Sequence, residues 1–155
     1  MKNTAYQHTP IGLIQLVEKD GKLLSVSFEK YQTQKEHTSL LLQEAKWQIS
    51  DYFEGKRKVF NLPLHFSCSP FQQDIYLALQ KVPYASTLAY KALATQVGNP
   101  KASRAVGTAM AQNPFPIILP CHRVILSDGS LGNYSGGVGT ISKQWLLDHE
   151  KAFAH

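Results

Sequence analysis

The sequence predicts an α/β (α+β) protein in two parts: a small N-terminal α/β domain with a β-hairpin and a helix, then a mostly helical C-terminal domain. Alternating apolar residues surround an Asp-Gly pair near the N-terminus, and apolar residues at helical spacing follow them. From residue 69 onward, helix start and stop signals replace the strand pattern. The 155 residues, 43% of them hydrophobic, suffice for one ordinary domain or two small ones. We expect domains at residues 1–66 and 67–155.

The hairpin is predicted at residues 11–17 and 22–28, on either side of Asp20-Gly21. An Asp-Gly pair between two apolar runs favours a tight two-residue turn. Leu24, Val26 and Phe28 alternate with polar residues, so we expect these three side chains to share one face of the second strand.

A helix should follow the hairpin and close the first domain. Leu42, Ala45 and Ile49 recur at helical spacing, and Gly55 is well placed to end that helix. Residues 61–64 and the polar stretch after them have the composition of a linker.

The second domain begins with a strong helix start at Ser69-Pro70. The serine can serve as N-cap, the proline suits the first helical position, and Gln72 completes the pattern of a capping box.

Two short helices joined by a glycine-containing turn are predicted next. Thr87 can cap a helix that ends at Gly98, and Asn99-Pro100 can start a second helix from Lys101 to about residue 111. This pattern is typical of a helix-turn-helix, whose second helix lies against DNA. The second helix is rich in small residues, with Arg104 as its long cation. Tight helix packing without DNA contact would leave the same pattern.

Cys121 is the candidate nucleophile. It lies in the segment 120–124, directly before His122 and Arg123. A free thiol has a pKa near ~8.5, and cationic neighbours raise its thiolate fraction. The alternative is that Cys121 is simply a small buried hydrophobe.

A turn at Ser127-Asp128-Gly129 and a polar, glycine-rich loop at residues 131–137 follow the cysteine. The loop lacks the Lys-Ser/Thr ending of a phosphate loop and the dinucleotide fingerprint, so we expect no nucleotide cofactor. A last helix, from about Ser142, carries Glu150 near its end.

The charge distribution favours a polyanionic partner for the middle of the chain. No Asp or Glu occurs between Asp74 and Asp128, and the cations in this gap equal the whole net charge of +5. Nucleic acid is the leading candidate, and an ordinary solvated surface is the alternative. The cations in the gap are Lys81, Lys91, Lys101, Arg104 and Arg123.

Cysteine usage and hydropathy exclude several classes of protein. Cys68 and Cys121 show neither metal-ligand nor disulfide-framework spacing, so no zinc site and no disulfide scaffold are expected. No apolar run approaches the ~18 residues that would span a bilayer. We expect a cytoplasmic protein without a metal, a cofactor or a membrane partner.

Taken in order, a series of motifs closely resembles the O6-alkylguanine-DNA alkyltransferases (methylated-DNA–protein-cysteine methyltransferases). The resemblance runs from about Phe71 to Glu150, and the N-terminal part is similar to the variable α/β domain of that family. An ordered series is far more specific than any single motif. The motifs are Tyr90, Gly98-Asn99-Pro100, Arg104-Ala105-Val106-Gly107, Asn113-Pro114, Pro120-Cys121-His122-Arg123-Val124, Gly132-Asn133-Tyr134-Ser135-Gly136-Gly137 and Trp145-Leu146-Leu147-Asp148-His149-Glu150.

The resemblance implies direct-reversal DNA repair. Cys121 would take the alkyl group from O6 of guanine, or from O4 of an alkylated thymine, and keep it as a thioether, so each molecule acts once. His122 would carry the thiol proton away through a water, and Glu150 would orient the imidazole. Tyr90 would rotate the target base outward and protonate the guanine ring.

The resemblance also implies how DNA is held. The protein would act as a monomer on double-stranded DNA, in the minor groove and with little sequence preference, and Arg104 would fill the gap left by the flipped nucleotide. The DNA-contacting residues would be Tyr90, Lys91, Asn99, Lys101, Ser103, Arg104 and Ser127. The substrate pocket would be formed by Met110, Asn113, Pro116, Val124, Asn133, Tyr134 and Ser135, with backbone carbonyls near Cys121 and Val124 reading the exocyclic amine.

The chain departs from the family pattern in three places. Ala85 stands where the family usually has glycine in a Pro-Tyr-Gly turn, and the segment 138–144 is about two residues longer than usual. No cysteine precedes Cys68, so the zinc site of some relatives is not expected here.

Three other functions fit parts of the sequence. A non-catalytic lesion sensor would share the fold, although such relatives usually replace the reactive cysteine. A transcription factor would use the helix pair for sequence-specific binding. A thiol hydrolase would use Cys121 and His122 but would leave the acid-free gap without a purpose.

Overall fold

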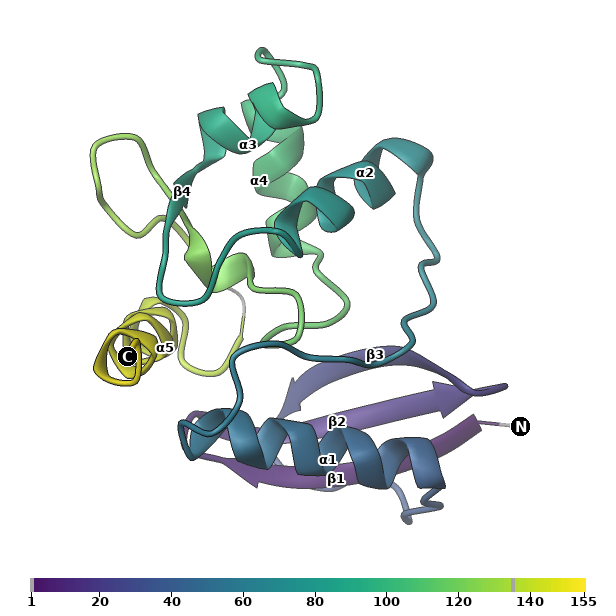
Figure 1. The fold of residues 1–155 in the computed structure, drawn as a ribbon. Coiled ribbons are helices and arrows are strands. Elements are labelled where there is room, and N and C mark those ends of the chain that lie inside the picture. Colours follow the sequence, from purple (N-terminus) through teal and green to yellow (C-terminus); the bar gives the residue numbers. More distant parts are fainter. Residues whose placement is uncertain (1, 135) are drawn as a thin grey trace. The chain divides into compact units, whose positions relative to one another are not determined.

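The computed structural model describes residues 2–134 and 136–155, and its internal contacts form two compact units, Met1–Phe66 and Ser67–His155 (Figure 1). None of the helices that these residues form combines the length and the apolar character that a bilayer crossing needs.

The first unit is a three-stranded antiparallel sheet with one helix packed across it (Figure 1). Strands β1 (Lys2–Thr9), β2 (Gly12–Lys19) and β3 (Lys22–Glu29) are neighbours in chain order. Asp20 and Gly21 have φ angles of 54° and 79°, the double positive φ of the turn that an Asp-Gly pair favours. The predicted hairpin is therefore confirmed. The first strand was missed because its sequence, KNTAYQHT, is mostly polar.

A bulge changes which side chains of β3 face the core. The register shifts between Val17 and Glu18, whose partners are Ser25 and Leu23, so that Leu24 is the extra residue. Leu23 is consequently fully buried, and the strict alternation predicted for Leu24, Val26 and Phe28 is wrong at its first position.

Helix α1 (Leu40–Phe53) covers the sheet with the predicted apolar face. Leu42, Ala45, Ile49 and Tyr52 are fully buried, and the Ser39 hydroxyl caps the helix by accepting from the Leu42 amide at 3.2 Å. Gly55 follows the helix with a φ of 77°.

The segment at residues 61–64 is tied to the first unit and does not run free as a linker. Asn61 exchanges two hydrogen bonds with the Gln48 side chain, at 3.0 and 2.9 Å. The Leu23 amide donates to the Pro63 carbonyl, and the His65 amide donates to the Leu23 carbonyl. This extended stretch therefore runs alongside β3.

The second unit is built from short elements. Its helices are α2 (Pro70–Leu79), α3 (Tyr90–Gln96), α4 (Ser103–Ala111) and α5 (Thr140–Ala152). A 3₁₀ turn, η1 (Cys121–Arg123), runs directly into β5 (Val124–Ile125), which pairs in parallel with β4 (Leu88–Ala89). Its core includes Ile75, Leu79, Leu93, Val106, Phe115 and Leu146, all fully buried.

Ser69 caps α2 as predicted, with its hydroxyl accepting from the Gln72 amide at 3.2 Å. The Gln72 side chain, which was expected to complete a capping box, donates to Gln112 Oε1 at 3.0 Å. This hydrogen bond ties the start of α2 to the residue after α4.

The helix pair differs from the prediction at both helix starts. Thr87 does not cap α3, because residues 88–89 form β4 and the N-cap is Ala89, which has no side-chain hydrogen bond. Gly98 follows α3 with a φ of 82°, as expected for a helix end. Helix α4 begins at Ser103, two residues later than predicted, because the Lys101 amide donates to Asn99 Oδ1 in a turn. Helix α5 begins at Thr140, two residues earlier than predicted.

Candidate active site

Cys121 and Tyr90 are brought together by the small parallel sheet. Leu88 pairs with Val124, and Ala89 pairs with Ile125. Cys121 lies three residues before Val124, and Tyr90 begins α3 directly after Ala89. The two side chains therefore meet although about thirty residues separate them in the sequence.

The chain reaches Cys121 through a sharply folded segment. The Asn113 side chain donates to the Leu119 carbonyl at 2.9 Å and accepts from the Phe115 amide at 2.9 Å. Ile117 has a φ of 76°, a conformation that a β-branched residue adopts only where the surrounding structure holds it. Asn113 thus fastens the loop that delivers the cysteine.

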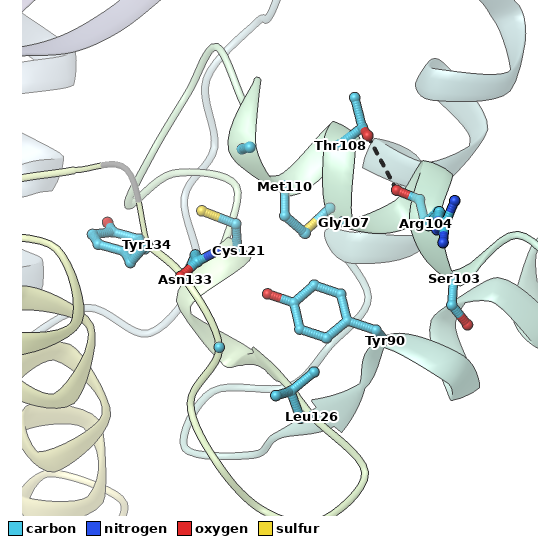
Figure 2. A pocket seen from close by; sticks show the side chains of 12 residues that line it. Tyr90, Ser103, Arg104, Gly107, Thr108, Met110, Cys121, Leu126, Asn133 and Tyr134 are labelled. Carbon is cyan, nitrogen blue, oxygen red and sulfur yellow. Dashed lines mark hydrogen bonds between the residues drawn. The ribbon is translucent and has the colours of Figure 1, made fainter.

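A pocket of about 740 Å³ opens beside the thiol, a volume within the range of small-molecule sites. Figure 2 shows Cys121, Tyr90 and Met110 around one space, with Arg104 and Ser103 on the α4 side and Tyr134 on the opposite side. Predicted residues that line the pocket are Tyr90, Ser103, Arg104, Met110, Cys121, Asn133 and Tyr134. Gly132, from the predicted glycine-rich loop, also lines the pocket, and the lining residues that were not predicted are Gly107, Thr108, Ala111 and Leu126.

Asn113, Pro116 and Val124 were also predicted at the pocket, but they are not among its lining residues. Asn113 fastens the loop described above, and Pro116 is buried in a bridge with Leu119. Val124 is buried, and its carbonyl accepts from Lys143 Nζ at 2.7 Å. Ser135 falls outside the described residues.

The predicted DNA-contacting residues divide by exposure. Lys91, Asn99, Lys101, Arg104 and Ser127 are exposed, whereas Tyr90 and Ser103 are partly buried at the pocket.

Arg123 does not belong to a cationic surface, in contrast to what the charge pattern indicated. It is only 6% exposed, and its guanidinium pairs with Glu150. The other cations of the acid-free gap, Lys81, Lys91, Lys101 and Arg104, are all exposed.

The Cys121 thiol is held in its neutral form, contrary to the expectation from its neighbours in the sequence. It is 5% exposed, and burial raises its pKa, although an Asn113 hydrogen bond and the Lys143 charge act in the opposite direction. The side chains of His122 and Arg123 point to Glu150, so neither adjacent residue gives the sulfur a close positive charge.

His122 and Glu150 form a fully buried pair behind the cysteine. Nε2 of His122 lies 2.6 Å from Oε2 of Glu150. Burial lowers the pKa of His122 despite this contact, so the imidazole is neutral. Burial acts to raise the pKa of Glu150, but the hydrogen bonds from His122 and Arg123 and the positive charge of Arg123 hold it well below its usual range.

These protonation states assign the histidine tautomer. An ionised carboxylate only accepts hydrogen bonds, so Nε2 of the neutral ring carries the proton and donates to Glu150. Nδ1 is then the basic nitrogen. It is buried and has no hydrogen-bond partner among the described residues.

Position 132 favours glycine because the Tyr90 side chain lies close to it. The φ of Gly132 is 71°, and a Cβ at this position would lie 3.2 Å from the tyrosine hydroxyl oxygen. A larger residue would therefore push against the ring that faces the cysteine. Burial raises the pKa of Tyr90, so its hydroxyl keeps its proton.

Lys143 is a site residue that the sequence reasoning missed. Its ammonium is fully buried and donates to the carbonyls of Val124, Leu131 and Asn133, which fastens the pocket wall to α5. Burial lowers its pKa to about 8. The spacing of Lys143, Leu146 and Glu150 on one helical face could have identified it.

Tyr134 places a polar atom without a partner at the pocket. The side chain is 8% exposed, and its buried hydroxyl has no hydrogen-bond partner within residues 2–134 and 136–155. No grouping of metal-ligating side chains occurs among these same residues. The site is thus a pocket with a thiol, a phenol and a buried acid–base pair.

The fold and site define a class of protein in which a buried Cys-His-Glu series lies beside a helix-turn-helix pair. The family model described as "6-O-methylguanine DNA methyltransferase, DNA binding domain" matches residues 70–152, and the corresponding "ribonuclease-like domain" matches residues 1–66. The chain belongs to the 6-O-methylguanine DNA methyltransferase family.

Relatives and solved structures agree over nearly the whole chain. The constitutive methylated-DNA–protein-cysteine methyltransferase of Bacillus subtilis is 40% identical over 152 residues, covering 92% of each protein. The O6-methylguanine methyltransferase structure from Mycobacterium tuberculosis has a TM-score of 0.87 at 34% identity and covers 100% of this chain and 96% of its own. A structure of the same bacterium's protein in complex with DNA has a TM-score of 0.84, also at 34% identity, over 98% and 93% of the two chains.

Proposed function

We propose that this chain is a methylated-DNA–protein-cysteine methyltransferase that repairs O6-alkylguanine in DNA by moving the alkyl group to Cys121. The observation that carries the proposal is the pocket of about 740 Å³ with the Cys121 thiol in its wall and the His122–Glu150 pair behind it. Family membership supports the activity, and the exposed cations of the second unit support a DNA partner.

The reaction is a displacement at the alkyl carbon. The Cys121 sulfur forms a bond to that carbon as the bond from carbon to O6 breaks, and the electron pair of the broken bond passes to guanine. The products are a thioether on the protein and guanine in the DNA. Because the thioether is not cleaved, one molecule repairs one lesion.

The thiol proton must leave the sulfur for this displacement. Nδ1 of His122 is the basic nitrogen of the site and receives the proton, directly or through a water, while Glu150 stabilises the imidazolium that forms. Tyr90 keeps its hydroxyl proton and faces the pocket, so it can protonate the guanine ring as negative charge develops there.

Base flipping brings the lesion to the thiol. A stacked base cannot enter the pocket, so the nucleotide rotates out of the helix at a cost of a few kcal/mol. Arg104 is exposed on α4 at the pocket and would occupy the space left in the stack. The wall formed by Asn133 and Tyr134 would then enclose the flipped base, with binding through the minor groove by a single copy of the chain.

The decisive experiment is mass spectrometry after incubation with a duplex containing O6-methylguanine. The Cys121 peptide should gain one methyl group, and Cys121→Ala should gain none while still binding the duplex. An unshifted mass of the wild-type peptide would reject the proposal.

Arg104→Ala separates base flipping from chemistry. This variant should react slowly with lesion-bearing duplex but at the wild-type rate with free O6-benzylguanine, because the free base needs no flipping. Equal loss on both substrates would contradict the role given to Arg104.

A further inference from the structure

Arg123 makes a two-pronged contact with the carboxylate that holds the active-site histidine. Its Nε lies 2.8 Å from Glu150 Oε1, and its Nη2 lies 2.9 Å from Oε2. This parallel arrangement uses the planar fork of arginine, which fixes a carboxylate in direction as well as in distance. All of these groups are buried.

Other contacts of Arg123 and Glu150 reach the turn before β4. Nη1 of Arg123 donates to the Val82 carbonyl at 2.8 Å, and the guanidinium carbon lies 5.5 Å from the centre of the Tyr84 ring. The Ala85 amide donates to Glu150 Oε1 at 3.1 Å. A guanidinium and a backbone amide therefore hold the carboxylate in addition to His122.

Arg123 and His122 both contact the same carboxylate oxygen of Glu150. Glu150 Oε2 accepts from Arg123 and lies 2.6 Å from His122 Nε2. Because a guanidinium is always charged, it serves as the counter-ion of the buried carboxylate, and the imidazole does not need a second proton. His122 can then remain neutral and basic in the resting protein.

We propose that Arg123 is a positioning residue for alkyl transfer: its guanidinium orients Glu150 so that His122 is held through Nε2 and stays a neutral imidazole, with Nδ1 free to take the thiol proton. This inference rests on the proposed function for its kinetic readout. Arg123 would act through Glu150 and His122, because it is not among the residues that line the pocket.

The charged and titratable groups around His122 determine in which direction its pKa should move when Arg123 is replaced. Glu150 raises the pKa of His122, whereas Arg123 and Lys143 lower it, and burial lowers it most. Tyr84, on the turn before β4, faces Arg123. Removing the arginine charge leaves the attraction of Glu150 less opposed, so the imidazole should protonate at higher pH.

The experiment compares Arg123→Met with wild type, using free O6-benzylguanine across pH 5 to 9. The rate of Cys121 alkylation should fall on the order of tenfold at its plateau, because the imidazole is less precisely held. The pH at which the rate is half its plateau should rise by about one unit. Lys151→Met, which removes an exposed cation from the same helix as Glu150, is the matched control and should change neither quantity.

Arg123→Lys tests orientation apart from charge, and it also covers the case in which the methionine variant does not fold. A lysine keeps the positive charge but cannot form the two-pronged contact. Its half-plateau pH should stay close to wild type while its rate falls several-fold. A full wild-type rate in Arg123→Lys, or an unchanged half-plateau pH in folded Arg123→Met, would overturn the inference.

NMR of ring-labelled histidine gives a readout that does not depend on activity. The His122 signals, assigned with a His122→Asn variant, should titrate at higher pH in Arg123→Met than in wild type. An identical titration would reject the role of Arg123 even if neither protein reacted. Failure of the wild-type protein to react with the free base would instead count against the proposed function.

Discussion

The two units of this chain bury different kinds of side chain. The first unit buries an apolar layer between sheet and helix, and its buried carboxylate, Glu18, accepts from the neutral Asn3 amide at 2.8 Å and from the Gly21 amide at 3.0 Å. The second unit buries His122, Arg123, Lys143 and Glu150.

This difference separates what a fold needs from what a site needs. An apolar layer between a sheet and a helix is stabilised mainly by the burial of apolar surface and does not depend on buried ion pairs. Buried ions lose hydration, and replacing them with apolar residues often leaves stability unchanged or improves it. The charges in the second unit are therefore explained by the reaction at Cys121 and not by stability.

The largest expected effect comes from removing the carboxylate at the centre of the buried network. Glu150→Ala leaves Arg123 buried without its counter-ion and should lower the free energy of unfolding by about 3–5 kcal/mol. The matched variant in the first unit, Glu18→Ala, should cost only about 1 kcal/mol because it removes hydrogen bonds to neutral groups. Urea unfolding monitored by circular dichroism measures both. If the two variants lost similar free energies of unfolding, the buried carboxylates of the two units would not differ in the way proposed.

Acid should weaken the second unit in two stages. Burial lowers the pKa of His122 from 6.5 in the folded protein. As the pH falls through about 6.5, His122 of the unfolded chain therefore binds a proton that the folded chain does not bind, and the folded state loses stability. The pKa of Glu150 is held below 4.5 by His122 and Arg123 against the effect of burial, so a further decline begins below about pH 4.5. Unfolding free energies from pH 8 to 3 should show both declines, and His122→Gln should lack the first. A flat curve between pH 7.5 and 5.5 would contradict this.

Lys143→Met should have a smaller effect that combines stability with pocket shape. It leaves the carbonyls of Val124, Leu131 and Asn133 without their donor and should cost about 2 kcal/mol. The loosened wall should also weaken binding of free O6-benzylguanine, measured as the concentration that gives half the maximal alkylation rate. Lys151→Met, exposed on the same helix, is the control. An unchanged half-saturating concentration would show that the ammonium does not hold the wall.

The smallest effect should be a gain in stability. Ala85 has a φ of 62°, which is strained for a residue with a Cβ and explains why the family usually has glycine in this turn. Ala85→Gly should raise the free energy of unfolding by about 0.5 kcal/mol, because relief of strain exceeds the added freedom of the unfolded chain. Asp20→Gly in the first unit, where φ is 54°, should raise the free energy of unfolding by less, because aspartate tolerates this conformation better than alanine does. Thermal melts compare the two variants with wild type. A melting temperature of Ala85→Gly below that of wild type would show that the backbone at Ala85 is not strained.

Periodicity and turn chemistry predicted most of the elements from sequence. The Asp20-Gly21 turn, the apolar face of α1 and the Ser69 cap are local features that the chain forms with its immediate neighbours. Thr87 failed as a cap because the parallel pairing of β4 with β5, a contact between distant segments, outweighs a local preference.

By itself, the sequence determined which residues can do chemistry: the ordered motifs single out Cys121, His122, Tyr90 and Glu150, since the type and order of residues are properties of the chain. Only the tertiary structure decided the state of these groups. Burial raises the pKa of Cys121, Arg123 is turned from the surface to Glu150, and Lys143 becomes the fastening of the pocket wall. Hydration and the nearest opposite charge set the protonation and direction of an ionisable group, and both are fixed only when distant segments pack together.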